Sequence, residues 1–269
     1  MVFNPLGPEL AWLWDIVAFF ISFIMVMMVV QINAAIEKSG KLSSTVTRKI
    51  VHIFAAPVWL LSWMLFSGGV LSRWIVMIVP IMFVLLFVAI GTGKMKNEEF
   101  VRSMSRSGDP KELLGGTLYY AILMVVIAVF WFYVPSSGNL VQATPMAFIV
   151  IGCLAGGDGL ADVIGRKYGG DKKFGIGGAE KTIAGCIGMF VGSFLFGIIL
   201  VFLFSFEVST FVVVNMIIPI LLVSLVVTIV EALSPKGIDN WIVTFVAIIM
   251  VIALPYIGFV WNFPVFTLF

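Results

Sequence analysis

The chain has 269 residues, of which 61% are hydrophobic and only 11% carry a charge. Soluble domains carry about 25% charged residues, so this composition excludes an ordinary water-soluble protein. The formal net charge of +2 is too small to indicate a nucleic-acid partner. The two cysteines, Cys153 and Cys186, lie in apolar stretches without metal-ligand spacing, and we expect them to be packing residues.

Apolar runs of about 20 residues, the length a helix needs to cross a bilayer, recur along the whole chain. They predict an all-α, polytopic integral membrane protein with about eight transmembrane helices. The expected spans are residues 12–32, 48–66, 71–91, 115–134, 143–164, 182–204, 209–230 and 241–262. Pro255 and Pro264 interrupt the last span, so seven helices are the alternative.

The basic residues indicate how these helices are oriented. Every lysine and arginine except Arg73 lies in or beside an odd-numbered connection between the predicted spans. Because basic residues accumulate on the cytoplasmic side, these connections should face the cytoplasm, and both termini should be non-cytoplasmic. The other polar residues gather in the same connections, so we expect a cytoplasmic active face, at the cell membrane if the source is a prokaryote.

The most polar stretch runs from Gly156 to Gly185 and reads GGDGLADVIGRKYGGDKKFGIGGAEKTIAG. Asp158, Asp162 and Arg166 follow one another at intervals of four, so on a helix they share one face. Carboxylates bind Mg²⁺, while cations and backbone N–H groups bind phosphate. The stretch therefore predicts a site for a divalent metal and a polyphosphate.

The glycine-rich part of this stretch, GGDKKFGIGG, is expected to be a flexible connector whose lysines close over phosphates. It lacks the GxxxxGK[ST] arrangement of a Walker loop, so by itself it is weak support for nucleotide binding. An ordinary solvated loop is the alternative. That alternative fits poorly, because Asp158 and Asp162 continue the apolar run before them and charges there are costly unless paired or hydrated.

A second polar group lies in the segment TVTRKIVHIFAAP, where Arg48 and His52 are four residues apart and share a helix face. Arg48 at this position suits a phosphate, and the alternative is that it reaches to lipid headgroups. His52 is the only histidine in the chain and lies about one turn into the membrane. A polar residue at that depth indicates function.

A third polar group lies in the last inner connection, VTIVEALSPKGIDNWIVTF, where Glu231 closes one predicted helix and Asp239 and Asn240 begin the next. Asp239 and Asn240 are alternatively caps of that helix. Glu231, at the end of an apolar run, has no such role. Together with Asp158 and Asp162 it would complete a carboxylate cluster on one face of the membrane.

Four motifs in combination resemble the CTP-dependent polyprenol kinase family, which includes dolichol, phytol and farnesol kinases and the yeast-type CTP-dependent diacylglycerol kinase. They are RKxxH at 48–52, GDGLADVIGRKYG at 157–169, EKTxxG at 180–185 and E-x7-DN at 231–240. The family-like core covers about 48–240, within an expected single transmembrane kinase domain of residues 1–269. The family usually has KTxEG, whereas this chain has Ala184, so the role of that glutamate is absent or falls to Glu180 or Glu231.

The resemblance implies transfer of the γ-phosphate of CTP to the hydroxyl of a polyprenol, a phytol-like alcohol or diacylglycerol, with Mg²⁺ as cofactor. We hypothesise that Asp158 and Asp162 hold the metal. The candidate catalytic residues are His52, Asp162, Glu231 and Asp239. The base for the lipid hydroxyl is expected to be His52, Glu231 or Asp239. Phosphate and nucleotide contacts are expected from Arg48, Gly157, Gly165, Arg166, Lys181, Thr182, Gly185 and Asn240.

Two other functions are alternatives. A CTP-dependent cytidylyltransferase acting on a phosphorylated lipid, as in CDP-diacylglycerol or CDP-archaeol synthesis, has similar segments and would release pyrophosphate. A secondary transporter would use the glycine-rich break to line a substrate path, with its charges near the membrane midplane. Here the polar residues gather at one face and no strong internal repeat is present, which favours a kinase.

Overall fold

The computed structural model describes residues 4–40, 42, 44–105, 107–132, 144–207 and 212–259. Over these residues the chain is helical, as predicted, and its only extended pairing is an isolated bridge between Phe174 and Lys181. Residue contacts divide the chain into two compact units, one formed by residues up to 139 and the other by residues 140–267. A single kinase domain over residues 1–269 stays a prediction.

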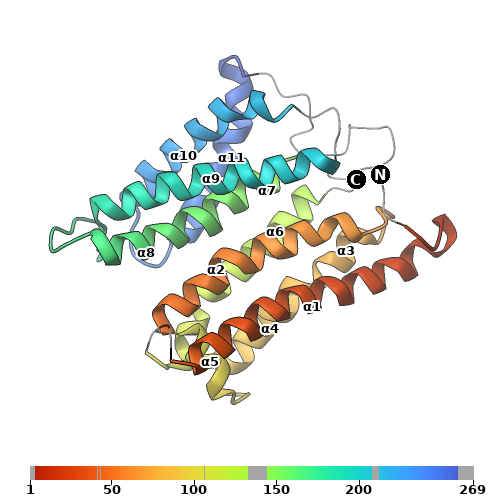
Figure 1. The fold of residues 1–269 in the computed structure, drawn as a ribbon, viewed down its shortest axis with the longest axis horizontal. Helices are drawn as coiled ribbons and strands as arrows, with labels where there is room; N and C mark the ends of the chain where they lie inside the picture. The colour runs from red at the N-terminus through yellow and green to blue at the C-terminus, as the bar shows by residue number, and fades with distance from the viewer. Residues whose placement is uncertain are drawn as a thin grey trace. The chain divides into compact units, whose positions relative to one another are not determined.

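The first unit is a group of helices tied together by buried polar contacts (Figure 1). Its helices are α1 (Ala11–Lys38), α2 (Ser44–Leu61), α3 (Ser72–Val76), α4 (Ile78–Gly91), α5 (Glu98–Met104) and α6 (Gly116–Trp131). The hydroxyls of Ser22 in α1 and Ser62, which follows α2, are 2.6 Å apart. Asp15 is fully buried in α1 and accepts hydrogen bonds from the Ser67 backbone N–H and the Ser72 hydroxyl. These contacts satisfy groups whose burial would otherwise be costly.

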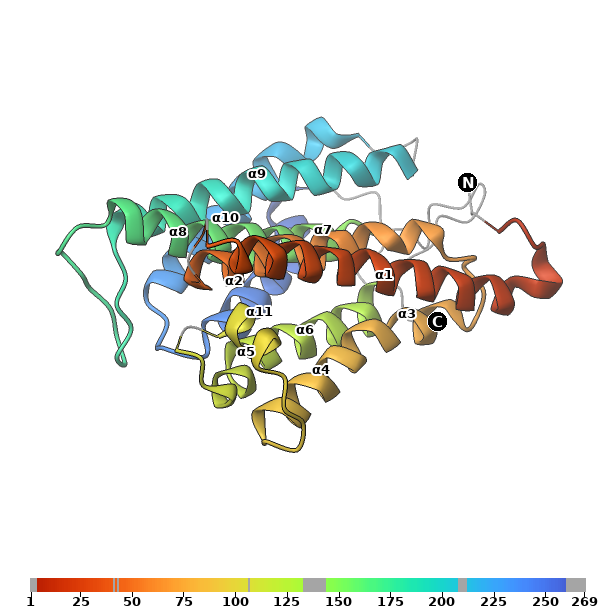
Figure 2. The same ribbon diagram turned by 60° about the horizontal axis from the view of Figure 1, so that its bottom comes forward.

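The second unit begins with one continuous helix from Met146 to Tyr168, in which a π-helical segment separates two α-helical parts. Its elements are α7 (Met146–Ile151), the π-helix η5 (Gly152–Gly157), α8 (Asp158–Tyr168), α9 (Ile183–Glu207), α10 (Ile217–Ala232) and α11 (Asp239–Ala253). Figures 1 and 2 both show α8 and α9 side by side, joined by a loop that extends beyond their ends.

Seven of the described helices are long and apolar enough to cross a membrane, which agrees with an integral membrane protein of the all-α class. They are Pro8–Lys38, Ser72–Gly91, Pro110–Trp131, Met146–Tyr168, Ile183–Phe206, Val213–Ala232 and Asp239–Ile257. Each coincides with one of the eight predicted spans. The predicted span ends at 133–134, 143, 209–211 and 260–262 lie outside the described residues.

The difference from eight spans lies at the second predicted span, 48–66, and not at the last. This segment is helical in α2 and continues as the 3₁₀ turn Ser62–Leu65. α2 has 18 residues, and its first turns contain Arg48, Lys49 and His52, so its full length is less apolar than the other seven helices. The orientation of the two termini stays a prediction.

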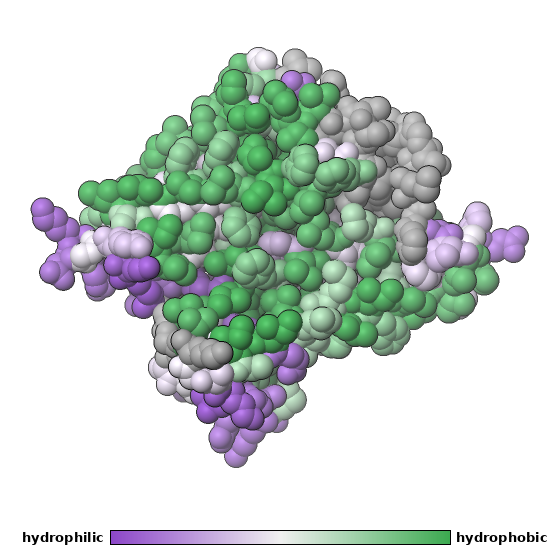
Figure 3. All heavy atoms as spheres, in the orientation of Figure 1, coloured by the Kyte–Doolittle hydropathy of each residue, from purple (hydrophilic) through white to green (hydrophobic). Residues whose placement is uncertain are grey.

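The outward faces of the long helices are apolar. On α9 the exposed residues Ile183, Ile187, Val191, Leu195 and Ile199 recur every four positions and so form one stripe along the helix. α10 has the same arrangement at Ile217, Leu221, Leu225 and Ile229. Figure 3 shows hydrophobic side chains along these helices and hydrophilic ones at the loop after α8. Lipid chains would cover such stripes in a bilayer.

Glycines allow α9 to pack closely against η5 and α8. A Cβ atom on Gly192 of α9 would lie 2.3 Å from the backbone oxygen of Gly156, and one on Gly152 would lie 2.7 Å from the backbone nitrogen of Gly197. The obstructing atoms belong to the backbone, which cannot move aside as a flexible side chain can. Only glycine therefore permits this approach, which is typical of helix pairs in membranes. The packing fixes the position of Asp158, where α8 begins.

We expect Gly192→Leu to destabilise the protein by about 1–3 kcal/mol, because the new side chain would be forced against the backbone of η5. Val191→Leu is the matched control, since it enlarges the neighbouring residue of the same helix on its exposed side. Thermal unfolding in detergent, followed by tryptophan fluorescence, measures both changes. Equal stability of the two variants would show that the glycine contact is unimportant.

Candidate functional site

The π-helical segment η5 leads directly to the first charged residue of the site. All six of its residues, GCLAGG, are buried, as are those of α7 before it. α8 begins immediately afterwards with Asp158, whose side chain is half-buried. π-helical turns inside α-helices occur frequently at functional sites. The helix therefore changes from apolar to charged at a single residue.

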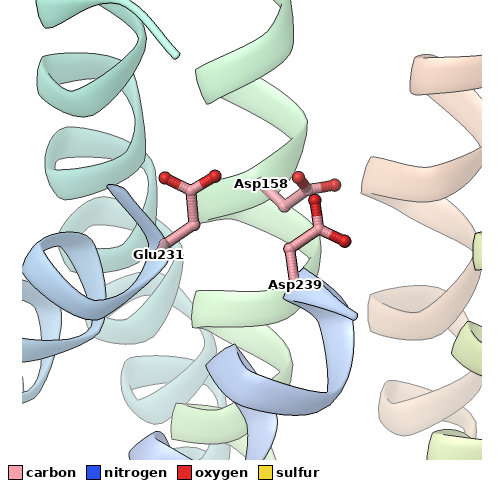
Figure 4. A group of neighbouring side chains, drawn as sticks. All are labelled: Asp158, Glu231 and Asp239. Atoms are coloured by element: carbon pink, nitrogen blue, oxygen red, sulfur yellow. The ribbon is translucent and has the colours of Figure 1, made fainter. Parts of the chain in front are cut away.

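Three carboxylates from three different helices meet at this point, and we call them the acidic cluster. Asp158 begins α8, Glu231 lies in the last turn of α10, and Asp239 begins α11. One carboxylate oxygen of each residue lies within 4.8 Å of those of the other two. Figure 4 shows the three side chains close together, with the carboxylate of Asp239 directed at that of Asp158. Negative charges at this spacing repel one another, so the cluster favours a cation.

The ammonium group of Lys181 supplies one positive charge to the acidic cluster. Its Nζ donates a hydrogen bond to Oε1 of Glu231 and lies 3.7 Å from Oδ2 of Asp239. Burial by itself lowers the pKa of Lys181. The attraction and hydrogen bond of Glu231, with further attraction from Asp239 and Asp158, outweigh burial and raise that pKa above its ordinary value. Lys181 is therefore charged at neutral pH.

A short hairpin fixes the backbone of Lys181. The Lys181 N–H donates to the Phe174 carbonyl at 2.7 Å, and the Phe174 N–H donates to the Lys181 carbonyl at 3.0 Å. Three glycines between these residues have positive φ, which glycine adopts without steric cost. Lys173 pairs with Glu180 across the hairpin at 2.5 Å. The segment expected to be a flexible connector is thus a defined turn in this structure.

Asp162 and Arg166 pair with each other one turn farther along α8. Arg166 Nε donates to Asp162 Oδ1 at 2.9 Å. Asp162 is not a member of the acidic cluster, although its spacing places it on the same face of α8 as Asp158. The structure therefore brings Asp158 together with Glu231, as the sequence suggested, and adds Asp239. A metal-binding role for Asp162 stays a prediction.

The three glycines expected to shape a nucleotide pocket lie in the contact between η5, α8 and α9. A Cβ on Gly165 would lie 3.2 Å from Cα of Gly185, and one on Gly157 would lie 2.2 Å from Oγ of Ser193. Thr182 precedes α9, and its Oγ1 accepts the N–H of Gly185 at 3.0 Å, which satisfies an amide at the helix start. The structure gives these residues packing and capping contacts, and nucleotide binding by them stays a prediction.

Arg48 and His52 lie on α2, in the first unit. Arg48 Nη1 is 3.6 Å from Glu112 Oε2, and the other oxygen of Glu112 accepts the Ser107 hydroxyl at 2.6 Å. The ring of His52 lies 4.2 Å from that of Tyr120, whose hydroxyl donates to the His52 carbonyl at 2.7 Å. The sequence did not identify these partners, because they are far along the chain and no local spacing connects them.

Asp239 and Asn240 begin α11, as predicted, but Asp239 is not its N-cap. The N-cap residue is Ile238. Oδ1 of Asp239 accepts the neighbouring Asn240 N–H at 3.1 Å, while its other carboxylate oxygen is the one near Lys181. Asp239 is therefore not the N-cap residue, although its carboxylate accepts one amide of the first turn, and it also belongs to the acidic cluster. Asn240, the next residue in the chain, is buried.

Comparison with known proteins identifies relatives that are named as kinases of prenyl alcohols. The chain is 37% identical over 161 residues to a probable phytol kinase 2, chloroplastic, of Oryza sativa subsp. japonica, covering 60% of this chain and 49% of that protein. It is 32% identical over 198 residues to the farnesol kinase, chloroplastic, of Arabidopsis thaliana, covering 74% and 61%. It is 30% identical over 241 residues to a probable phytol kinase 3, chloroplastic, of Glycine max, covering 88% and 71%.

The extent of these matches differs among the relatives. The chain spans about half the length of several of them, including the rice protein. The soybean match extends over most of both chains. No family model matches the chain, and no solved structure matches it.

We expect millimolar Mn²⁺ to raise the melting temperature of the wild-type protein in detergent, because an ion that binds only the folded state stabilises it. At a hundredfold excess over the dissociation constant the gain is about 2.7 kcal/mol. Asp158→Asn should remove most of this shift, and Asp162→Asn should retain it, since only Asp158 belongs to the acidic cluster. Equal losses in the two variants would place Asp162 among the ligands.

Proposed function

The chain belongs to the CTP-dependent polyprenol kinase family, and we propose on this basis that it transfers a phosphate group to the hydroxyl of a prenyl alcohol. The relatives named as phytol and farnesol kinases support this acceptor class over diacylglycerol. The structural observation that carries the proposal is the acidic cluster with its bound lysine, formed by three membrane-crossing helices, at the end of α10 and the start of α11. A kinase acting on a lipid alcohol needs a charged site at such a boundary, because the acceptor comes from the bilayer and the nucleotide from water.

The acidic cluster suits a magnesium ion. Asp158, Glu231 and Asp239 offer carboxylate oxygens, the hard ligands that Mg²⁺ prefers, and they come from rigid helices. Bound there, the ion would neutralise negative charge on the phosphate oxygens of the donor, which is its usual contribution to phosphoryl transfer. We therefore assign the metal to these three residues, in place of the pair Asp158 and Asp162.

Two basic residues are assigned to the phosphate groups of the donor. Lys181 reaches the acidic cluster directly, and Arg166 is bound to Asp162 on the same helix as Asp158. Phosphoryl transfer depends mainly on positioning the phosphates and on stabilising their charge. A lysine and an arginine close to carboxylates provide cations whose positions are already fixed. We propose CTP as the donor, on the strength of the resemblance of the motifs to the family.

We assign the base for the acceptor hydroxyl to Asp162. Glu231 and Asp239 are assigned to the metal, so their oxygens would be engaged by the ion. Asp162 lies one turn from Asp158 on the same face of α8, outside the acidic cluster. Its carboxylate is held in place by Arg166, whose Nε donates to Oδ1 at 2.9 Å, and a base has to be positioned in this way to reach the acceptor hydroxyl. His52, in the first unit, is the alternative.

The site would face the compartment that holds the nucleotide, which the distribution of basic residues predicts to be the cytoplasm. The loop that follows α8 contains the lysines of the hairpin and ends at Lys181. The exposed apolar stripes of α9 and α10 leave the bilayer as the medium around these helices. The acceptor would therefore reach the site laterally from the lipid.

The test is the transfer of label from γ-labelled CTP to phytol, farnesol, geranylgeraniol, dolichol or diacylglycerol by the protein in nanodiscs with Mg²⁺. We expect label in a prenyl alcohol, and a loss of about 10²–10³-fold in kcat for Asp158→Asn, because the charge of the transferring phosphate loses stabilisation. Glu98→Gln is the control, since Glu98 is an exposed residue at the start of α5, in the first unit. Cytidine label in a phosphorylated lipid with release of pyrophosphate would indicate a cytidylyltransferase.

Asp162→Asn should lower kcat by about 10²–10⁴-fold, the usual contribution of a general base, while the Mn²⁺-dependent rise in melting temperature is retained. His52→Ala should lower kcat by less than about tenfold if it acts only through packing against Tyr120. The same radiolabel assay measures both variants at saturating substrates. The reverse order of the two losses would assign the base to His52.

A further inference from the structure

We propose that the ammonium group of Lys181 occupies the place of the divalent cation in the acidic cluster and leaves it when metal and nucleotide bind. This inference rests on the proposed function and adds a coupling between the two ligands of the site. Lys181 is then a positioning residue that alternates between the acidic cluster and the donor phosphate. It offsets charge in the cluster in the absence of ligands and contacts phosphate in their presence.

The contacts of Lys181 are those expected of a substitute cation. Its Nζ is hydrogen-bonded to Glu231, which is 3% exposed, and it lies 3.7 Å from Asp239. Asp158, the third member of the cluster, also attracts the same ammonium. One lysine thus interacts with all three carboxylates that would hold the metal. The ammonium offsets one negative charge of the cluster, and a divalent ion would bring twice that charge to the same oxygens.

Lys181 and a divalent ion cannot both interact fully with the acidic cluster. Both would take oxygens of Glu231 and Asp239, and two cations this close repel one another. The lysine side chain is able to move, because its four-carbon stem is flexible. Its backbone stays in place, because the bridge to Phe174 holds it. The ammonium can therefore turn toward a phosphate without rearrangement of the fold.

Nucleotide and metal should consequently strengthen each other's binding. A triphosphate offers the ammonium new oxygen partners and so frees the carboxylates for the metal. The reciprocal effect, a metal that strengthens nucleotide binding by the same factor, follows from thermodynamic linkage. Metal alone should bind less tightly than metal together with a nucleotide, because it has to displace the lysine. Such a device would favour filling of the metal site together with the donor.

If the pairing of Lys181 with the acidic cluster is purely structural, variants that lack this lysine should change Mn²⁺ affinity in the opposite direction. If Lys181 only held α10 and α11 in place, its removal would loosen the cluster and weaken metal binding. If it competes with the metal, its removal would tighten metal binding. The sign of the change in Mn²⁺ affinity therefore separates the two roles.

The experiment is a titration of Mn²⁺ into the full chain in nanodiscs, without nucleotide, with free Mn²⁺ followed by electron paramagnetic resonance. We expect Lys181→Met to bind Mn²⁺ roughly tenfold more tightly than the wild type, because one competing charge is lost. Lys181→Arg keeps the charge and should remain within about threefold of the wild type. Lys173→Met is the control for the loss of a lysine outside the cluster, since Lys173 pairs with Glu180.

A second readout is the melting temperature in EDTA, which removes metal. EDTA should lower the melting temperature of the wild type only slightly. Lys181→Met in EDTA should melt at a lower temperature than the wild type, and added Mn²⁺ should raise its melting temperature again. Lys181→Gln serves the same purpose if the methionine variant does not fold. CTP should tighten Mn²⁺ binding in the wild type and have a smaller effect in Lys181→Met.

Unchanged or weaker Mn²⁺ binding by both neutral variants would overturn the inference and leave the kinase proposal intact. Absence of Mn²⁺ binding in every variant, including the wild type, would overturn the inference together with the assignment of the metal site. The transfer of label from CTP to a prenyl alcohol by the wild type is measured separately. It decides whether the kinase proposal survives that second outcome.

Discussion

The repulsion among three carboxylates is the constraint on which the site of this protein depends. Asp158, Glu231 and Asp239 lie within 4.8 Å of one another at the ends of apolar helices, where unpaired charge is costly. Lys181 offsets part of that repulsion through its contacts with Glu231 and Asp239. Removing one partner of such a buried pair leaves the charge of the other partner uncompensated. A substitution at any one of the four residues would therefore destabilise the charges of the remaining three. The separate helices that carry these residues must therefore be held close together against the repulsion of the carboxylates.

Close helix packing meets this requirement. Glycines in η5, α8 and α9 bring backbones together at distances that no side chain would allow, as at Gly192 and Gly156. In a lipid environment this packing is a main source of helix association, because apolar side chains gain little by leaving lipid for protein. The same packing contacts involve the three glycines that the sequence suggested for a nucleotide pocket, Gly157, Gly165 and Gly185. The segment 156–185 therefore serves both helix packing and the site, because α8, which carries Asp158, is also the helix that packs against α9.

The arrangement favours a kinase over the two alternative functions. A transporter is expected to hold its charges near the midplane, whereas two members of the acidic cluster, Glu231 and Asp239, lie at the end of α10 and the start of α11. The relatives are named as kinases of phytol and farnesol, not as cytidylyltransferases. Ala184 replaces a glutamate that the family usually has, and Glu231 is the carboxylate that contacts the adjoining Lys181. Whether Glu180 or Glu231 takes the role of that glutamate stays a prediction.

Composition and hydropathy by themselves determined the membrane class and seven of the predicted spans, and the resemblance of four motifs indicated the family. These features are local, because hydropathy and i, i+4 spacing can be read from a single segment. Tertiary structure decided which charges meet. Asp162 shares a helix face with Asp158 but pairs with Arg166, while Asp239, 81 positions after Asp158 in the chain, joins the cluster. Contacts between distant segments depend on how helices pack, and glycine contacts and loop geometry set that packing beyond the reach of local spacing.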